Sequence, residues 1–250
     1  GLIIKKISPE DVLKAEERED SGVAREALTV RAKGLPVAKD MNRLVLRISG
    51  LNETLNLPED SRQHREGDLW VFERQEPGKA AATEPFTASD ADEYLAPDIF
   101  IQSSHPRIQE MAASIAGETE DPWIAAVQLH DWVYEHVKKV HVLSVPSALE
   151  VLERLEGDCN EHAVLYVAFA RALKIPSRVA IGLVWSDELN AFGYHAWPEV
   201  YTGRWIALDP TFGERYASPT HIKLFTGSID QWARLMAFVG KIEIEVVSVS

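Results

Sequence analysis

Residues 157–173 read GDCNEHAVLYVAFARAL, and this stretch decides the fold. Gly157 and Asp158 are residues typical of a helix start. The run that follows them is apolar on almost every side, which is the pattern of a helix buried in the centre of a domain. Pro176 marks its end, because proline disfavours helical geometry in the residue before it. The sequence therefore predicts a buried central helix with Cys159 at or near its N-terminus.

Cys159 is the only cysteine of the chain, so an intramolecular disulfide is excluded. A lone cysteine is most often a small, buried hydrophobic residue. The N-terminus of a helix, however, carries roughly +0.5 of an elementary charge, which stabilises a thiolate, and a nearby histidine adds to the effect. The position of Cys159 thus makes a nucleophile as good an interpretation as a structural residue.

Two strands predicted after the helix carry residues that would complete such a site. Residues 178–185 predict a central strand, and residues 194–201, YHAWPEVY, predict a second strand with His195 at its mouth. Asp209 follows the returning strand. A thiolate attacks an acyl carbon, an imidazole takes and returns the proton, and a carboxylate orients the imidazole. We therefore predict a catalytic triad of Cys159, His195 and Asp209.

The register of the predicted hairpin tests this triad. Successive strand residues face opposite sides of a sheet, so a two-residue loop at Thr202-Gly203 would turn Asp209 away from His195. The triad needs both side chains on one face. We therefore expect an odd-length loop, such as residues 202–204, or a bulge, with Trp197 opposite Asp209.

These residues resemble the bacterial transglutaminase-like superfamily across residues 93–225. The resemblance rests on motifs in the right order: GDCNEHA at 157–163, ARALKIPSRV at 170–179, YHAWPEVY at 194–201 and RWIALDPT at 204–211. It implies a papain-like α+β fold, in which the helix of the nucleophile packs against an antiparallel sheet. It also implies Cys159 as nucleophile, His195 as general base and acid, and Asp209 as the orienting residue.

The resemblance implies the shared chemistry of a thioester acyl-enzyme, but it does not identify the particular reaction. Members include protein cross-linking enzymes, peptide and amide hydrolases, and deglycosylating amidases, and all form a thioester acyl-enzyme that an amine or water resolves. Eukaryotic cross-linking members use calcium, and the sequence has no Asp-rich loop of the EF-hand kind. We therefore expect a hydrolase, a cysteine protease or amidase. The alternatives are a true protein-glutamine gamma-glutamyltransferase and a non-catalytic scaffold domain of the same fold.

The chain divides into two expected regions joined by a linker. Residues 1–80 predict a small β-rich region with a short charged helix ending near Glu19, and residues 81–92 predict a linker rich in small residues and Pro. Residues 93–250 predict the catalytic region. The strands expected in the first region lie at 27–32, 43–49 and 68–74, and the helices expected in the second lie at 106–116, 122–138 and 147–155.

Other candidate residues have simpler interpretations. Cys159 and His162 form a C-x-x-H pair, but a metal site would need a second pair, so neither a metal nor another cofactor is expected. His162 is interpreted as a helix-packing residue, and Trp132 as a core residue. Trp197 could line the acyl site or belong to the core. His130, His136 and His141 are interpreted as surface or boundary residues.

The most plausible oxyanion donor is the backbone N–H of Cys159, because amides at a helix start lack internal acceptors. The sequence assigns no second donor.

The composition restricts the partners. With 26 Lys and Arg against 39 Asp and Glu, the formal net charge is −13. Nucleic acid and anionic membranes, which require clustered cations, are therefore not expected, and we expect a peptide or protein substrate. The sequence contains no run of about 18 apolar residues, so no membrane span is predicted. Because the chain starts at Gly1, we expect a trimmed, exported or membrane-anchored bacterial protein; its oligomeric state is left open.

Overall fold

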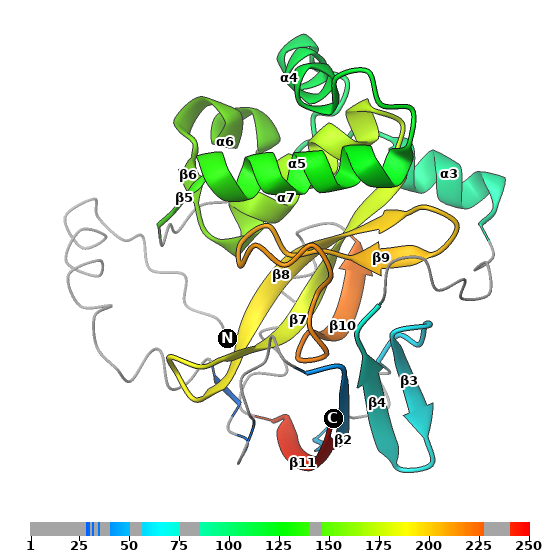
Figure 1. Ribbon diagram of the computed structural model, residues 1–250, viewed down its shortest axis with the longest axis vertical. Helices are drawn as coiled ribbons and strands as arrows, with labels where there is room; N and C mark the ends of the chain where they lie inside the picture. The colour runs from blue at the N-terminus through cyan, green and yellow to red at the C-terminus, as the bar shows by residue number, and fades with distance from the viewer. Residues whose placement is uncertain are drawn as a thin grey trace, which may run out of the picture.

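A computed structural model describes residues 29–30, 32, 35, 41–50, 57–75, 86–140, 147–227 and 241–250. Figure 1 shows a layer of helices over a central sheet, with a second sheet on the far side of it. The helices are α3 (Ala88–Leu95), α4 (Pro106–Ala116), α5 (Pro122–His136), α6 (Ala148–Arg154) and α7 (Cys159–Ala172). Helices combined with antiparallel sheets form the α+β class that the sequence predicted.

The central sheet contains the hairpin that the sequence predicted. Its strand order is β1-β8-β7-β10, and β9 pairs with β8 beside this path. All these pairs are antiparallel. The strands are β1 (Thr29–Val30), β7 (Ser177–Ser186), β8 (Ala191–Tyr201), β9 (Trp205–Ala207) and β10 (Ile222–Gly227). Two short parallel strands, β5 (Lys138–Lys139) and β6 (Glu156–Gly157), lie just before α7.

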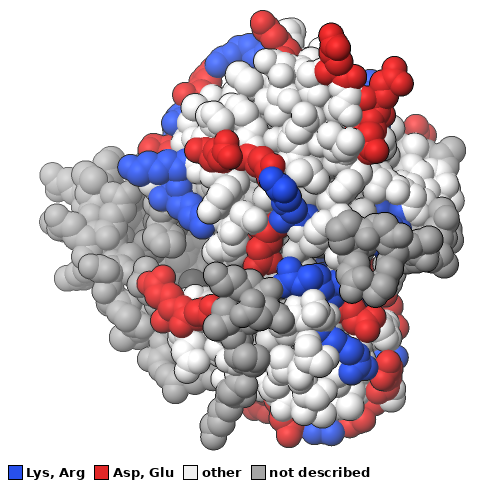
Figure 2. Space-filling view, viewed as in Figure 1, with Lys and Arg blue, Asp and Glu red and all other residues white. Residues whose placement is uncertain are grey.

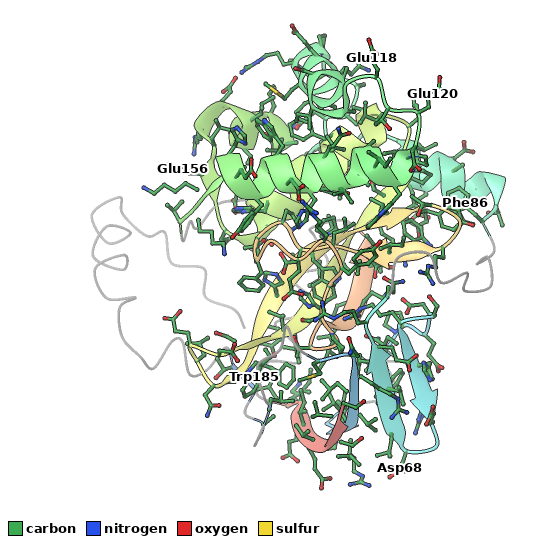
Figure 3. All side chains as sticks on the ribbon, in the orientation of Figure 1. Asp68, Phe86, Glu118, Glu120, Glu156 and Trp185 are labelled. Carbon is green, nitrogen blue, oxygen red and sulfur yellow. The ribbon has the colours of Figure 1, made fainter. Side chains whose placement is uncertain are left out.

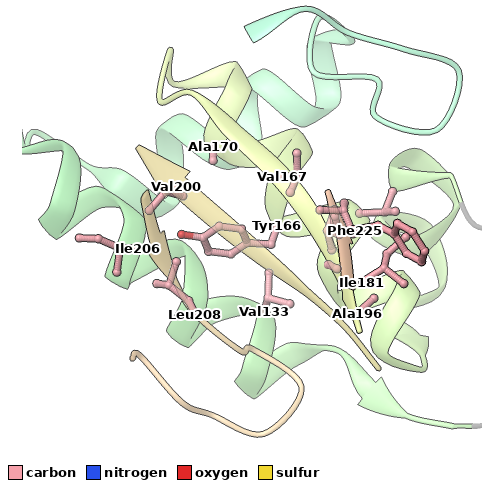
Figure 4. Close-up of a cluster of buried hydrophobic side chains, with 14 of the residues drawn as sticks. Val133, Tyr166, Val167, Ala170, Ile181, Ala196, Val200, Ile206, Leu208 and Phe225 are labelled. Atoms are coloured by element: carbon pink, nitrogen blue, oxygen red, sulfur yellow. The ribbon is translucent and has the colours of Figure 1, made fainter. Parts of the chain in front are cut away.

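Helix α7 is the centre of the core, as its sequence predicted. Every residue from 161 to 171 is buried, and the helix contacts β7 and β8 on one side and α4, α5 and α6 on the others. Figure 4 shows Tyr166 among Val133, Val200 and Leu208. Its hydroxyl donates a hydrogen bond to the carbonyl of Ala126 at 3.0 Å, so its polar end is satisfied inside the core. Each fully buried large apolar side chain contributes about 1.5–3 kcal/mol, which fixes the helix against the sheet.

The second sheet combines segments from both ends of the chain. Its order is β11-β2-β4-β3, with β2 (Arg43–Ser49), β3 (Gln63–Glu66), β4 (Leu69–Glu73) and β11 (Glu243–Val249). The predictions of strands at 43–49 and 68–74 are confirmed. Strands β3 and β11 were not predicted. The charged helix expected near Glu19 lies outside the described residues.

Strand pairing crosses the predicted boundary between the two regions. β11, in the expected catalytic region, pairs with β2 of the expected N-terminal region, and β1 of that region pairs with β8. The sequence does not predict these pairings, because each joins segments far apart in the chain, and local patterns carry no information about such contacts. The division into domains itself stays a prediction.

The residues 81–92 that the sequence predicts as a linker are helical in their second half. Helix α3 begins inside this segment, after Thr87, and residues 81–85 lie outside the described part. The Thr87 hydroxyl accepts from the Asp90 N–H at 3.2 Å, and the Asp90 carboxylate accepts from the Thr87 N–H at 2.7 Å. This reciprocal capping box explains why a segment rich in small residues becomes helical.

Candidate active site

Cys159 is the first residue of α7, and Asp158 caps the helix. The Asp158 carboxylate accepts from the Asn160 N–H at 2.9 Å, and the Glu161 carboxyl group accepts from the Asp158 N–H at 3.0 Å. Cys159 is half-buried at the edge of the core and is a free thiol. As a first-turn amide, its N–H has no acceptor within the helix, so the oxyanion role stays a prediction that this geometry permits.

Gly157 is required by the close approach of Glu161. A Cβ atom at residue 157 would lie 2.2 Å from the Cβ of Glu161, closer than any side chain tolerates. Glu161 is buried beneath the helix start, and burial together with the Asp158 carboxylate raises the pKa of Glu161 to about 8. The spacing of Gly157, Cys159 and Glu161 therefore reflects one tightly packed helix start. Figure 3 labels Glu156, which leads into it, at the side of the helical layer.

The hairpin has the odd-length loop that the triad required. Tyr201 pairs with Trp205, and Glu199 pairs with Ala207, which leaves residues 202–204 as a three-residue loop. This prediction is confirmed. The loop keeps His195 and Asp209 on one face, and the Nε2 of His195 lies 2.7 Å from the Oδ2 of Asp209.

Asp209 is fully buried, and its carboxylate accepts four hydrogen bonds. Its Oδ2 faces the Nε2 atoms of His195 at 2.7 Å and of His221 at 2.9 Å. Its Oδ1 accepts from the backbone N–H groups of Thr211 at 2.8 Å and Phe212 at 3.2 Å. Burial opposes ionisation, but the attraction of His195 and the hydrogen bonds from both imidazoles outweigh it and lower the pKa of Asp209. The carboxylate is therefore ionised throughout the physiological range.

His195 lies between two aromatic rings. Phe212 stacks on it at 4.8 Å between centroids and Trp197 at 6.1 Å. Burial opposes its charge, but attraction to Asp209 and Cys159 and hydrogen bonds to both raise the pKa of His195 to about 10. Since Asp209 occupies Nε2, Nδ1 is the ring nitrogen left for the thiol. The structure thus brings together all three residues that the sequence singled out.

Trp197 belongs to the core rather than lining the site. Its side chain is fully buried, and it packs beneath His195 with Ala180, Ala207 and Ala217. Trp132 also packs against the core, as predicted, with its ring edge-on to Phe169. Phe212, which the sequence did not single out, is the outer neighbour of His195 and is 43% exposed.

The predicted surface or boundary position of His130 is wrong. His130 is buried, with Nε2 3.2 Å from the backbone oxygen of Asp209 and Nδ1 2.9 Å from the Asp131 carboxylate. Its place on α5 facing the Asp209 loop depends on tertiary packing, which helical spacing alone does not reveal. His136 is exposed, as predicted, and His141 lies outside the described residues.

His162 is a packing residue, as predicted. It is fully buried, with Nδ1 2.6 Å from the Asp158 carbonyl oxygen and Nε2 3.1 Å from that of Val137. Burial lowers the pKa of His162, so the ring is neutral and only one of these contacts carries a proton. Both nitrogens face carbonyl groups, so His162 offers Cys159 no partner for a metal.

His195, Asp209 and His221 form a set whose composition could bind a metal, with ligand atoms within 4.8 Å of one another. The two contacts to Asp209 measure 2.7 and 2.9 Å. Neighbouring ligand atoms around a tetrahedral zinc ion are about 3.3 Å apart, given bonds of about 2.0–2.1 Å. The spacing of this set is therefore that of hydrogen bonds.

The surface carries charged side chains of both signs. On the face in Figure 2, acidic and basic side chains alternate without an extended basic patch. Among the described residues, no helix is both long enough and apolar enough to span a bilayer.

Comparisons with known proteins agree with this fold. The family model of the transglutaminase-like superfamily matches residues 109–210, which include Cys159, His195 and Asp209. A proposed cysteine protease from Cytophaga hutchinsonii has a TM-score of 0.53 at 18% identity, covering 84% of this chain and 84% of its own. The periplasmic domain of TgpA from Pseudomonas aeruginosa gives 0.43 at 15% identity, covering 75% and 73%. Red sea bream transglutaminase gives 0.41 at 11% identity, covering 75% and 49%.

No curated protein sequence matches the chain. The likeness to the Cytophaga protein supports a shared fold, and the range matched by the family model contains the three residues that the sequence singled out. Over residues 109–210 this chain is therefore similar to the transglutaminase-like superfamily.

Proposed function

We propose that this protein is a cysteine enzyme that cleaves peptide or amide bonds through a thioester acyl-enzyme. The observation that carries the proposal is the row formed by Cys159, His195 and Asp209. The thiol begins a helix and contacts an imidazole, whose Nε2 lies 2.7 Å from a fully buried carboxylate. Such a row is the arrangement in which a thiol becomes nucleophilic at neutral pH.

The row supports a two-step reaction. The Cys159 thiolate attacks the acyl carbon, and the backbone N–H of Cys159 is the donor proposed to stabilise the oxyanion. The imidazolium of His195 gives its proton to the departing amine, which leaves a thioester. His195 then takes a proton from water as that water attacks the thioester, and it returns the proton to the thiolate when the carboxylic acid departs. Asp209 keeps Nε2 protonated throughout, so that Nδ1 exchanges protons.

We propose hydrolysis in preference to amine transfer. Transfer requires that water be kept away from the thioester, because exclusion of water prevents hydrolysis of a reactive intermediate. Cys159 is only half-buried, and Phe212, the outer neighbour of His195, is 43% exposed. The exposed surface of these two residues favours hydrolysis.

Amine incorporation separates the two reactions. We would incubate the protein with glutamine peptides and a labelled primary amine, and measure ammonia, peptide carboxylate and label in the same sample. Hydrolysis predicts that new carboxylate is matched by ammonia when a glutamine side chain is cleaved, or by a new amino terminus when a peptide bond is cleaved. Label incorporated in place of carboxylate would establish gamma-glutamyl transfer instead.

Alkylation separates an enzyme from a scaffold domain. Iodoacetamide at pH 6 is expected to modify Cys159 rapidly in the folded protein, and His195→Ala is expected to slow the reaction at least about tenfold, since the imidazole stabilises the thiolate. His136→Ala changes an exposed histidine of α5 and serves as the matched control. A thiol that reacts only after denaturation would identify a non-catalytic scaffold.

A further inference from the structure

A second histidine contacts the carboxylate of the proposed triad. His221 is fully buried just before β10, and its Nε2 lies 2.9 Å from the Oδ2 of Asp209. That oxygen also faces His195 at 2.7 Å. The reaction proposed above assigns no role to His221.

The hydrogen-bond geometry fixes the tautomers of both rings. An ionised carboxylate only accepts hydrogen bonds, so the Nε2 atoms of His195 and His221 must both carry a proton. On its other side, the Nδ1 of His221 lies 3.2 Å from both the hydroxyl and the carbonyl oxygen of Ser218, and that hydroxyl is 2.9 Å from the Thr220 hydroxyl. Ser218 therefore partners Nδ1, while Nε2 directs its proton to Asp209.

We propose that His221 is a positioning residue that holds Asp209 in the orientation that His195 needs; this inference rests on the proposed function. Apart from His195, three donors hold the carboxylate: the N–H groups of Thr211 and Phe212 on Oδ1, and His221 on Oδ2. The first two fix one oxygen. Apart from His195, His221 is the only donor to the other oxygen within the described part of the chain, and it therefore fixes the direction of the lone pairs that His195 meets.

His221 is itself held from the second sheet. Arg62, which lies just before β3 and is buried, donates to the Ser218 carbonyl oxygen at 2.7 Å. The Ser218 N–H donates to the Glu214 carboxylate at 2.6 Å. Ser218 is therefore fixed on both sides, and its hydroxyl presents a stationary partner to His221. A continuous row of contacts runs from Arg62 through Ser218, His221 and Asp209 to His195.

The tautomer can be measured in the unmodified protein. Long-range nitrogen–proton NMR spectra of histidine-labelled protein should show Nε2-bound protons on both His195 and His221. A His221 ring protonated only at Nδ1 would overturn the inference, because such a ring cannot donate to Asp209.

Two variants test the positioning role through iodoacetamide alkylation. His221→Ala removes the donor, and alkylation at pH 6 should fall about 10- to 100-fold, the range expected when a catalytic group is displaced. The rate should instead rise towards pH 9, as for an ordinary thiol. In His221→Gln, the side-chain amide donates from near the former Nε2, and it should restore the rate to within a fewfold of the unmodified protein.

Val151→Ala is the control for an effect of lower stability on the alkylation rate, because it truncates a buried residue of α6 away from Asp209. That variant should melt earlier but keep the alkylation profile. If His221→Ala alkylates with the rate and pH profile of the unmodified protein, or if His221→Gln is as slow as His221→Ala, the inference fails. If Cys159 of the unmodified protein does not react at pH 6, the proposed function fails instead, while the NMR result still decides the tautomer of His221.

Discussion

Asp209→Asn is the substitution for which the structure gives the sharpest expectation. The amide has the shape of the carboxylate, but one of its ends donates hydrogen bonds. If the amide nitrogen takes the Oδ1 place, it meets the N–H groups of Thr211 at 2.8 Å and Phe212 at 3.2 Å. Each of these buried donor–donor contacts costs about 1–3 kcal/mol, so this orientation is disfavoured by about 2–6 kcal/mol.

The opposite orientation loses no hydrogen bond but changes the protons. The amide nitrogen then faces His195 and His221, and each ring can accept from it only when its proton moves to Nδ1. The Nδ1 proton of His195 would point at Cys159, so the ring could no longer take the proton of the thiol. We therefore expect Asp209→Asn to fold and to retain the site, with a loss of turnover of about 10⁴-fold, as for the wrong tautomer in a triad.

Three measurements check this expectation. Thermal unfolding should show a folded variant, histidine NMR should show protonated Nδ1 on His195, and alkylation at pH 6 should fall at least about tenfold because the imidazolium loses its carboxylate. Asp209→Ala is the comparison, since it leaves both rings without a partner and should destabilise the fold more. A variant that folds with Nε2 protonated and alkylates at the normal rate would refute the reasoning.

Two further substitutions test the surroundings of the triad. Burial and Asp158 raise the pKa of Glu161 from 4.5 to about 8, so between these pH values the folded state holds a proton that the unfolded state releases. The free energy of unfolding should therefore fall as the pH rises from 4.5 to about 8, by up to about 1.4 kcal/mol per pH unit. Glu161→Gln keeps the capping hydrogen bond without titrating, so urea unfolding at pH 5 and pH 8 should show a smaller fall in the variant, and equal falls would contradict a protonated Glu161. Phe212→Ala removes the outer neighbour of His195, so a bulky maleimide should react with Cys159 faster relative to iodoacetamide, at a cost in stability of about 1 kcal/mol or less; an unchanged ratio would show that Phe212 does not limit access.

The sequence predicts the elements whose information is local. The apolar run after Asp158 identifies α7, and the alternation around His195 identifies β8. The requirement that His195 and Asp209 share a face predicts an odd-length loop or a bulge, and the register shows a three-residue loop. Each of these conclusions depends on residues within about a dozen positions of one another, where periodicity and turn chemistry apply directly.

The sequence does not predict contacts that depend on how distant segments return to one another. His221 reaches Asp209 because the intervening residues fold back, with Asp209 and Glu214 exchanging backbone hydrogen bonds at 2.7 and 2.9 Å. No repeat or motif marks that loop. The pairing of β11 with β2 joins the two ends of the chain and is equally invisible to a local pattern. The capping box at Thr87 is a local signal that the sequence interpretation overlooked.

The second sheet is joined to the central sheet by side-chain amides, which form the backbone hydrogen bonds that a neighbouring strand would form. The side-chain amide of Gln63 accepts from the Lys223 N–H at 2.8 Å and donates to the Lys223 carbonyl at 2.9 Å. Gln75 treats β9 in the same way, with contacts of 3.1 Å to the Ala207 N–H and 2.6 Å to the Trp205 carbonyl. These two amides satisfy backbone groups on β10 and β9 that an uncovered edge would leave to water or to another chain.

A buried charge fixes the position of this attachment. Lys223 is almost fully buried, and its ammonium lies against the carboxylates of Asp60 and Glu199. Buried ion pairs of this kind add little net stability, but a displaced partner would leave an unpaired charge, at a cost of about 3–5 kcal/mol. The second sheet therefore docks in one register. Because β10 begins directly after His221, and Arg62 of the docked segment holds Ser218, the register that satisfies Lys223 also sets the place of His221 beside Asp209. The two sheets thus define the proposed active site jointly. Its geometry depends on contacts of Asp60 and Arg62, which the sequence analysis assigns to the N-terminal region and not to the catalytic region.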